Sequence, residues 1–309
     1  MGKTQDLREI LNVPDEIIQA GLNGELVFFV GAGASMLLGL PSWSGLATNA
    51  LDELRKNEFL NYSQIDQLKT LDPQKQLSIA YLIAEENNYK LNLGKYLTGK
   101  SAGDSIYKAI NDIGCPCVTT NYDELIAPRF IETKNGSATA APVVRISERD
   151  KFFAKLLNEP GTVVHLHGAI SKPETMIVTT KDYLEHYDDE HVQQFLGELF
   201  NKNTVLFIGY GLEEAEILEH ILRRGSAKAT RERRRFALQG FFRSQQPLYE
   251  NLHDYYEKSF GVHLLGFVRD HENYKRLEGI VKAWANQIKV RKPPLVNDVD
   301  YMDEVLRDA

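Results

Sequence analysis

Short apolar runs and longer amphipathic segments follow one another along most of the chain. Apolar runs of this length are typical of strands that are buried on both faces of a sheet. Strands that alternate with helices form a largely parallel sheet with helices on both faces, so the pattern predicts a Rossmann-like α/β fold. The predicted strands lie at residues 26–30, 117–120, 142–146, 162–168, 176–180, 204–208, 236–241 and 262–267.

Segments with helical spacing separate these runs. The strongest start signal is in "DPQKQLSIAYLIAEENNY", where Asp72 precedes Pro73 at the first helical position. The long, mostly helical stretch between the first two strands predicts a small helical subdomain at about 45–112, inserted in one domain over 1–290. Residues 291–309 read as a Pro-broken linker and a short acidic helix. The other predicted helices lie at residues 4–20, 46–59, 182–199, 213–224, 248–258 and 271–290.

A glycine-rich turn follows the first strand, in "ELVFFVGAGASMLLGLPSWSGL". Gly31 and Gly33 allow a sharp turn and a close approach to a ligand. The backbone amides of a helix start there favour an anion such as a pyrophosphate. The P-loop lysine is missing, however, and Met36 stands where the dinucleotide fingerprint has its third glycine. This motif alone is weak support for a nucleotide site.

Composition narrows the classes of function. The 309 residues carry a formal net charge of −7, which argues against a broad nucleic-acid-binding face. An arginine-rich stretch at 223–235 is either a solvated loop or a contact for nucleic acid or an acidic partner. Cys115 and Cys117 are the only cysteines, which excludes a disulfide framework and a four-cysteine zinc site within this chain. With two cysteines and no disulfide framework, we expect a cytoplasmic protein. The apolar part of 26–40 is too short and glycine-split to span a bilayer, so no membrane segment is expected there.

Polar residues and glycines gather where four predicted strands end. Ligands bind outside the carboxyl ends of the strands in open parallel sheets. These residues therefore predict a ligand site at that edge: Gly31, Gly33, Ser35, Asn121, Asp123, His167, Gly168, Gly209, Tyr210 and Gly211.

The segments "GAGASMLLGLP", "TTNYD" and "HLHG" resemble, in this order, three motifs of the sirtuin superfamily, which are NAD-consuming proteins with a Rossmann-like fold. The resemblance runs from about residue 24 to 290 and implies that Asn121 and His167 are catalytic. No metal is expected, because the zinc-ribbon cysteines of the deacylases are absent. The implied contacts with NAD are Gly31, Ala32, Gly33, Ser35, Asp123, Gly209, Tyr210 and Leu212.

With "GLPSW", "VTTKDY" and "FIGYGL" added, the chain looks like the bacterial sirtuin-like domains of antiphage defence systems. That resemblance implies an NAD⁺ glycohydrolase that makes nicotinamide and ADP-ribose in abortive infection. It also implies control by assembly, through a homo-oligomer or a partner ATPase, Argonaute-type or sensor subunit. A sensor that binds NAD or ADP-ribose without turnover, and a protein deacylase or ADP-ribosyltransferase, remain alternatives, as do cyclised products.

The residue types suggest roles for the candidate side chains. The Asn121 amide can bind ribose hydroxyls or orient a water, and a neutral His167 can accept a proton. Asp123 either contacts the ligand or caps the next helix. His165 faces the same side of its strand as His167, and we expect it to be structural. The remaining histidines lack metal-ligand spacing and are assigned no chemistry: His186, His191, His220, His253, His263 and His271.

Overall fold

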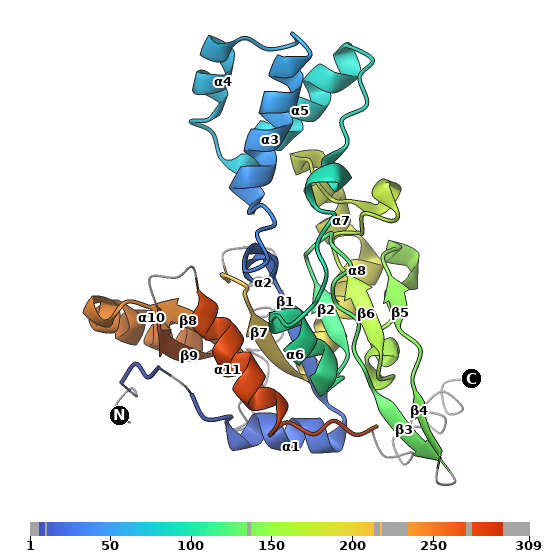
Figure 1. Cartoon of the computed structure of the whole chain (residues 1–309), viewed down its shortest axis with the longest axis vertical. Helices are drawn as coiled ribbons and strands as arrows, with labels where there is room; N and C mark the ends of the chain where they lie inside the picture. Colours follow the sequence, from blue (N-terminus) through green and yellow to red (C-terminus); the bar gives the residue numbers. More distant parts are fainter. Residues whose placement is uncertain are drawn as a thin grey trace.

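A seven-stranded parallel sheet forms the centre of the protein (Figure 1). The computed structural model describes residues 6–9, 11–134, 137–212, 217, 234–269 and 274–292. The strand order is β5-β6-β2-β1-β7-β8-β9, and without β5 it is that of the doubly wound dinucleotide-binding fold. The predicted Rossmann-like fold class is therefore confirmed. The strands are β1 (Leu26–Val30), β2 (Cys117–Thr119), β5 (Val144–Ile146), β6 (Thr162–His165), β7 (Thr204–Ile208), β8 (Arg235–Phe241) and β9 (His263–Val268).

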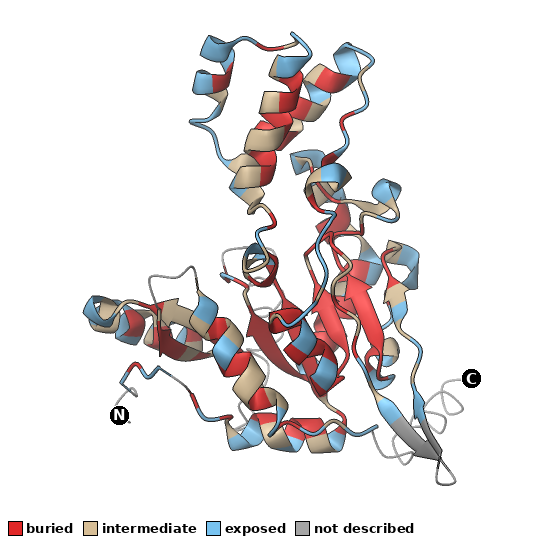
Figure 2. Ribbon diagram, viewed as in Figure 1, coloured by how far each residue is buried: buried red, intermediate tan, exposed pale blue. Residues whose placement is uncertain are grey.

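Alternate strand residues supply two apolar layers, one on each face of the sheet. Val27 and Phe29 belong to the layer covered by α8 (Glu190–Lys202) and α10 (Gln246–Phe260). Phe28 and Val30 belong to the opposite layer. All residues of β1 are buried, as Figure 2 shows for the centre of the sheet. The opposite layer is covered by α1 (Asp15–Asn23), α6 (Ile106–Ile113) and α11 (Lys275–Ala285).

A group of helices beyond the sheet has an apolar core of its own (Figure 1). Its first long helix begins after Ser42, whose side chain accepts a hydrogen bond from the Gly45 amide at 3.1 Å. Asp72 caps another helix as predicted, by accepting from the Lys75 amide at 3.0 Å. We call this group the helical region; α6, although inside the predicted 45–112, packs on the sheet beside α11 instead. The helical region comprises α3 (Trp43–Lys56), α4 (Tyr62–Leu68), α5 (Pro73–Glu86) and the 3₁₀ helix η1 (Leu93–Tyr96).

The amino-terminal helix is shorter than predicted and begins at Asp15, not near residue 4. Pro14 forces the residue before it into an extended conformation. Arg8 forms a parallel bridge with Phe267, and its carbonyl oxygen accepts from the Val268 amide at 2.8 Å. The segment therefore supplies partners to the outer edge of β9, where a strand would otherwise have unpaired backbone groups.

The helix predicted at 182–199 is in fact two helices, α7 (Thr180–Asp188) and α8. Asp189 is extended between them, and its carboxylate accepts from the amides of His191 and Val192 at 2.9 and 3.3 Å. This is a new N-cap, so the chain ends one helix and starts another at the same residue.

The strand predicted at 176–180 does not form: residues 176–178 have no regular secondary structure, and α7 begins at Thr180. The Ile177 amide donates to the His167 carbonyl oxygen at 2.9 Å, and the Ile177 carbonyl oxygen accepts from the Tyr122 hydroxyl at 2.5 Å. These loop contacts take the place of a neighbouring strand. An antiparallel hairpin of β3 (Ile131–Lys134) and β4 (Ser137–Ala140) was not predicted.

The described part of the chain ends with two residues that pack back on the domain. The Arg291 amide donates to the Gly21 carbonyl oxygen at 3.0 Å. The predicted terminal helix, most of the helix at 213–224, the arginine-rich stretch as far as residue 233, His220 and His271 lie outside the described residues. Within the described residues, no helix is both long and apolar enough to cross a bilayer. The remaining short elements are α2 (Ala32–Met36), η2 (Arg149–Lys151), η3 (Ala154–Asn158), η4 (Pro173–Thr175) and η5 (Arg243–Gln245).

Candidate functional site

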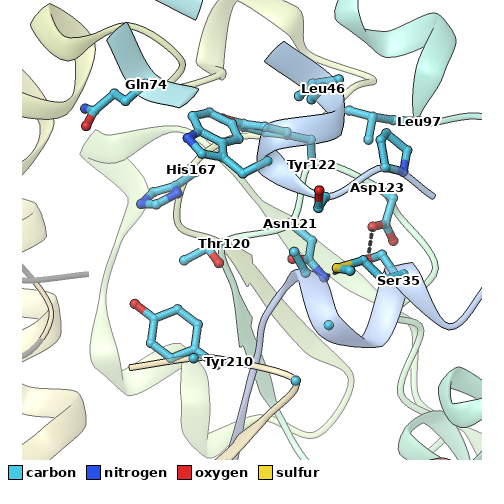
Figure 3. A pocket seen from close by; sticks show the side chains of 18 of the residues that line it. Ser35, Leu46, Gln74, Leu97, Thr120, Asn121, Tyr122, Asp123, His167 and Tyr210 are labelled. Carbon is cyan, nitrogen blue, oxygen red and sulfur yellow. Dashed lines mark hydrogen bonds between the residues drawn. The ribbon is translucent and has the colours of Figure 1, made fainter. Parts of the chain in front are cut away.

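A cavity of about 470 Å³ opens at the carboxyl ends of the central strands, facing the helical region (Figure 3). Its volume lies within the range of small-molecule sites, roughly 300–1,000 Å³. The chain changes sides of the sheet between β1 and β7, and this switch point is where such folds bind ligands. The cavity is lined by Ala32, Gly33, Ser35, Met36, Pro41, Ser42, Trp43, Leu46, Gln74, Leu97, Thr120, Asn121, Tyr122, Asp123, His167, Tyr183, Gly209, Tyr210 and Gly211.

Two glycine turns, after β1 and after β7, pack directly on each other in the cavity wall. The Gly33 amide donates to the Gly209 carbonyl oxygen at 2.8 Å. A Cβ on Gly33 would lie 2.8 Å from that oxygen, so no larger residue fits. The Ala34 amide likewise donates within the protein, to the Gly31 carbonyl oxygen at 3.1 Å. The predicted anion contact therefore cannot use the Gly33 and Ala34 amides in this conformation.

Asn121 follows β2 and is held by its amide nitrogen. Nδ2 lies 3.1 Å from the Gly31 carbonyl oxygen, 2.9 Å from Ser35 Oγ and 3.2 Å from the Tyr107 hydroxyl. A carbonyl oxygen only accepts hydrogen bonds, so the nitrogen end of the amide must face Gly31. The oxygen Oδ1 is then the end of Asn121 offered to the cavity (Figure 3).

A buried polar network lies behind Asn121. Ser35 Oγ donates to Asp123 Oδ2 at 2.7 Å and lies 2.7 Å from the Tyr107 hydroxyl (Figure 3 draws the Ser35–Asp123 bond). Burial raises the pKa of the Asp123 carboxyl, and burial also raises the pKa of the Tyr107 hydroxyl well above its usual range. Ser35 and Asp123, two of the predicted ligand contacts, thus line the cavity, and their polar atoms also belong to this network. Tyr107 has no motif and escaped the sequence analysis.

His165 supports Asn121 from the next strand. Its Nδ1 lies 3.2 Å from the backbone carbonyl oxygen of Asn121. Because that oxygen can only accept a hydrogen bond, Nδ1 carries the proton. Burial lowers the pKa of this imidazole and keeps it neutral. His165 therefore holds the backbone of Asn121 in place, which is a structural role.

His167 stands on the cavity wall with Asn121, after the end of β6 (Figure 3). Its Nε2 lies 2.7 Å from the Tyr187 hydroxyl and its Nδ1 3.3 Å from the Tyr183 hydroxyl. Burial, with the neighbouring His186 as a lesser cause, holds the pKa of His167 well below its usual range. The imidazole is therefore neutral at pH 7 and keeps one nitrogen able to accept a proton.

Aromatic side chains from separate elements form another part of the wall. The Trp43 ring of α3 lies 6.0 Å from that of Tyr122 and 6.4 Å from that of Tyr183, between ring centroids. Such surfaces stack well on the flat ring of a ligand. These residues are not among the predicted site residues, although they lie in the quoted segments "GLPSW", "TTNYD" and "VTTKDY".

Three residues of the predicted ligand site, Gly31, Gly168 and Leu212, do not line this cavity. The Gly31 amide donates to the Ile208 carbonyl oxygen at 3.0 Å, and its carbonyl oxygen holds Asn121. Leu212 is only 2% exposed and belongs to an apolar core layer. Tyr210 does line the cavity, with its ring 5.5 Å from that of Phe207.

Part of the chain is similar to a known protein family. Residues 117–263 match the family described as "SIR2-like domain". This stretch contains Asn121, Asp123 and His167, whereas the glycine turn after β1 precedes it.

Two curated relatives cover about two thirds of the chain. Defense-associated sirtuin 2 of Bacillus subtilis is 28% identical over 217 residues, which are 65% of this chain and 19% of that protein. NAD(+) hydrolase ThsA of Cytobacillus dafuensis is 26% identical over 217 residues, 68% of this chain and 40% of that protein. The chain thus spans less than half the length of either relative. Residues 117–263, and the parallel sheet to which they contribute, are thus similar to SIR2-like domains.

Proposed function

We propose that the cavity binds NAD⁺ and hydrolyses the bond between nicotinamide and ribose. The observation that carries the proposal is the pairing of an amide oxygen, Asn121 Oδ1, with a neutral imidazole, His167, on the wall of one cavity. The similarity to a relative named NAD(+) hydrolase supports the substrate.

The proposed reaction needs a positioned water and a proton acceptor. As the bond from C1′ to the nicotinamide nitrogen breaks, its electron pair leaves with the nicotinamide, and positive charge builds up on the ribose. Nicotinamide leaves as a neutral molecule, so no acid is required. Asn121 Oδ1 accepts a hydrogen bond from the attacking water or a ribose hydroxyl, and His167 takes the proton that the water loses. The products are nicotinamide, ADP-ribose and one proton.

The lining suggests how the rest of the substrate is held. Trp43, Tyr122 and Tyr183 provide aromatic surface for a nicotinamide or adenine ring. Neither Lys nor Arg occurs among the described residues that line the cavity. The pyrophosphate contacts therefore fall to hydroxyl groups such as those of Ser42 and Thr120, and to backbone amides.

The test is direct measurement of NAD⁺ turnover. Purified wild-type protein, Asn121→Ala and His167→Ala are incubated with NAD⁺, and nicotinamide, ADP-ribose and cyclic products are separated by chromatography. We expect ADP-ribose from the wild type and a loss on the order of 100-fold or more in each variant. Circular dichroism checks that the variants are folded. Equal turnover by wild type and folded His167→Ala would contradict the assigned role.

One observation favours a second candidate, binding of NAD or ADP-ribose without turnover. Both ring nitrogens of His167 lie beside tyrosine hydroxyls, and this arrangement also suits a fixed binding wall. Titration calorimetry with NAD⁺ separates the two: saturable binding with no product, at any protein concentration, supports the sensor. A deacylase or ADP-ribosyltransferase activity has no such observation in its favour.

We further propose that the activity serves antiphage defence by depleting NAD⁺, as the name Defense-associated sirtuin 2 of a relative suggests. Such an enzyme must be restrained in a healthy cell, and we propose assembly as the control, through a homo-oligomer or a partner ATPase, Argonaute-type or sensor subunit. Specific activity that rises with protein concentration, together with mass from light scattering, would support self-assembly. Full activity in a dilute monomer would contradict it.

A further inference from the structure

A cluster of two histidines and a glutamate lies at the opposite end of the sheet from the cavity. His253 and Glu257 are four residues apart on α10 and so share a face of the helix. His263 is the first residue of β9, so it lies at the amino ends of the parallel strands, whereas the cavity opens at the carboxyl ends of the central strands. Two residues, Gly261 and Val262, join α10 to β9, which brings His263 back beside the helix.

The potential ligand atoms of this cluster converge. One nitrogen of each histidine and one carboxylate oxygen lie within 4.8 Å of one another. His253 Nδ1 is 3.5 Å from Glu257 Oε2, and His263 Nδ1 is 3.8 Å from Glu257 Oε1. The corners of a tetrahedron with metal–ligand bonds of about 2.1 Å are about 3.4 Å apart, so small side-chain rotations would complete the geometry.

The two histidines of the cluster are packed against other side chains, and His253 is buried. His253 is 8% exposed, and its Nδ1 is buried without a hydrogen-bond partner among the described residues. Its ring packs 5.9 Å from Tyr249, and the His263 ring packs 6.0 Å from Phe236. A buried polar nitrogen without a partner is unfavourable unless something else binds it. Asp254, the other carboxylate near His253, pairs with Lys258 at 2.5 Å and is not needed for the site.

We propose that His253, Glu257 and His263 bind a divalent transition-metal ion of the zinc type. Two imidazoles and a carboxylate are a ligand set typical of zinc, with a fourth position left for water. Through this set the metal joins the carboxyl-terminal half of α10 to β9, the last strand of the sheet. The site is independent of the proposed NAD⁺ chemistry, because its ligands line no part of that cavity.

The sequence hides this site because its ligands are not spaced as a motif. His253 and Glu257 have helical spacing, but His263 follows after the helix end and a turn. The missing cysteines say nothing about a histidine and glutamate site, and the prediction that His253 and His263 have no chemistry considers histidine spacing in sequence alone.

Metal binding is tested on the full chain after removal of any polyhistidine tag and dialysis against chelator. Zn²⁺ uptake is measured by calorimetry and elemental analysis, and Co²⁺ provides the visible absorption of a tetrahedral site. We expect one equivalent bound by the wild type and affinity weakened by more than about 100-fold in His253→Ala, His263→Ala and Glu257→Gln. Wild-type protein should also unfold at a higher temperature with Zn²⁺ than without it.

His191→Ala is the matched control, because it removes a half-exposed histidine whose Nδ1 lies 3.6 Å from Asp189, outside the cluster. This variant should bind Zn²⁺ like the wild type. Glu257→Gln keeps the size of the side chain, so a folded protein without the site is available even where an alanine variant fails to fold. No uptake by the wild type, or equal uptake by folded Glu257→Gln, would overturn the proposal.

Discussion

Asn121 and His167 both line the cavity. Neighbouring groups of the protein determine the orientation of the Asn121 amide, and burial determines the protonation of His167. The Gly31 carbonyl, Ser35 and Tyr107 bind the nitrogen of the Asn121 amide, so that its oxygen faces the cavity. Burial keeps His167 neutral. The hydrogen-bonding state of each side chain therefore depends on the protein groups packed around it.

Tyr107→Phe tests the network without changing the cavity lining. Its hydroxyl contacts Ser35 Oγ and Asn121 Nδ2. Loss of this hydroxyl should loosen the Asn121 amide, so we expect the rate of NAD⁺ hydrolysis, kcat, to fall on the order of 10-fold with little change in KM. The free energy of unfolding should fall by about 1 kcal/mol.

Tyr89→Phe is the control for this change. The Tyr89 hydroxyl donates to Glu53 Oε1 at 2.7 Å, in the helical region and away from the cavity lining. It should lower stability by a similar amount and leave kcat unchanged. A kcat equal to that of the wild type in Tyr107→Phe would show that the Tyr107 hydroxyl is not needed to position Asn121 for hydrolysis.

His186→Phe tests the pH dependence of stability. Burial lowers the pKa of His186 to about 4, and neither ring nitrogen has a hydrogen-bond partner among the described residues. The unfolded imidazole binds a proton below about pH 6.5, whereas the folded one does not until about pH 4. Stability is therefore lost as pH falls through this range.

The Phe variant binds no proton at residue 186 in either state. Near pH 5, the loss of unfolding free energy should be smaller than in the wild type by about 1 kcal/mol per pH unit. Urea unfolding at several pH values between 6.5 and 4 measures this slope. Identical slopes for the two proteins would show that His186 is not buried as a neutral group.

At the scale of elements, turns at the strand ends decide where the site residues stand. The start of α2 needs Gly33 because the turn after β7 touches it. The turn after His167 needs Gly168, which has a φ of +85° and lies against the Thr175 carbonyl. Helix starts such as Asp72 and Asp189 depend only on local caps.

Gly168→Ala should disturb both the backbone and the site. A residue with a side chain at this φ costs about 1–3 kcal/mol, and its Cβ would collide with the Thr175 carbonyl oxygen. The backbone shift would move His167, so NAD⁺ turnover should fall together with the unfolding free energy.

Gly99→Ala separates the two causes. Gly99 has a φ of +80°, but a Cβ there would meet nothing within 4 Å. This variant should lose only the free energy of unfolding that the unfavourable φ costs, and it should keep its activity. Equal stability losses in the two variants, measured by urea unfolding, would show that the collision is relieved without cost.

At the scale of the molecule, the cavity needs both the sheet and the helical region. The strand ends supply Asn121 and His167, while α3 and α5 supply Trp43, Leu46 and Gln74, and Leu97 follows directly after η1. Neither part alone encloses a ligand, so substrate affinity depends on how the two meet.

Trp43→Ala tests that dependence. Trp43 packs near Tyr122 and Tyr183 across the junction, so its loss removes apolar surface from the ligand and widens the cavity. We expect KM for NAD⁺ to rise about 10-fold, as the loss of one stacking contact suggests. Tyr62→Ala, which removes a 71% exposed aromatic ring of the same region, should leave KM unchanged. An unchanged KM in Trp43→Ala would place the substrate elsewhere.

The sequence by itself determined the parallel sheet, the capped start of α5 and the polar strand ends that meet at one edge. These features depend on local composition: apolar runs bury themselves, Asp before Pro starts a helix, and parallel strands end on the same side. Even the resemblance to sirtuins rests on short segments at those strand ends.

Only the tertiary structure decided which end of Asn121 faces the cavity and which aromatic rings line it. It also decided that residues 6–9 run along β9 instead of forming a helix, and that His253, Glu257 and His263 meet. Each of these outcomes depends on partners distant in sequence or across a turn, whose free energy of contact outweighs local preference. A pattern of neighbouring residues carries no information on such partners until the chain has packed.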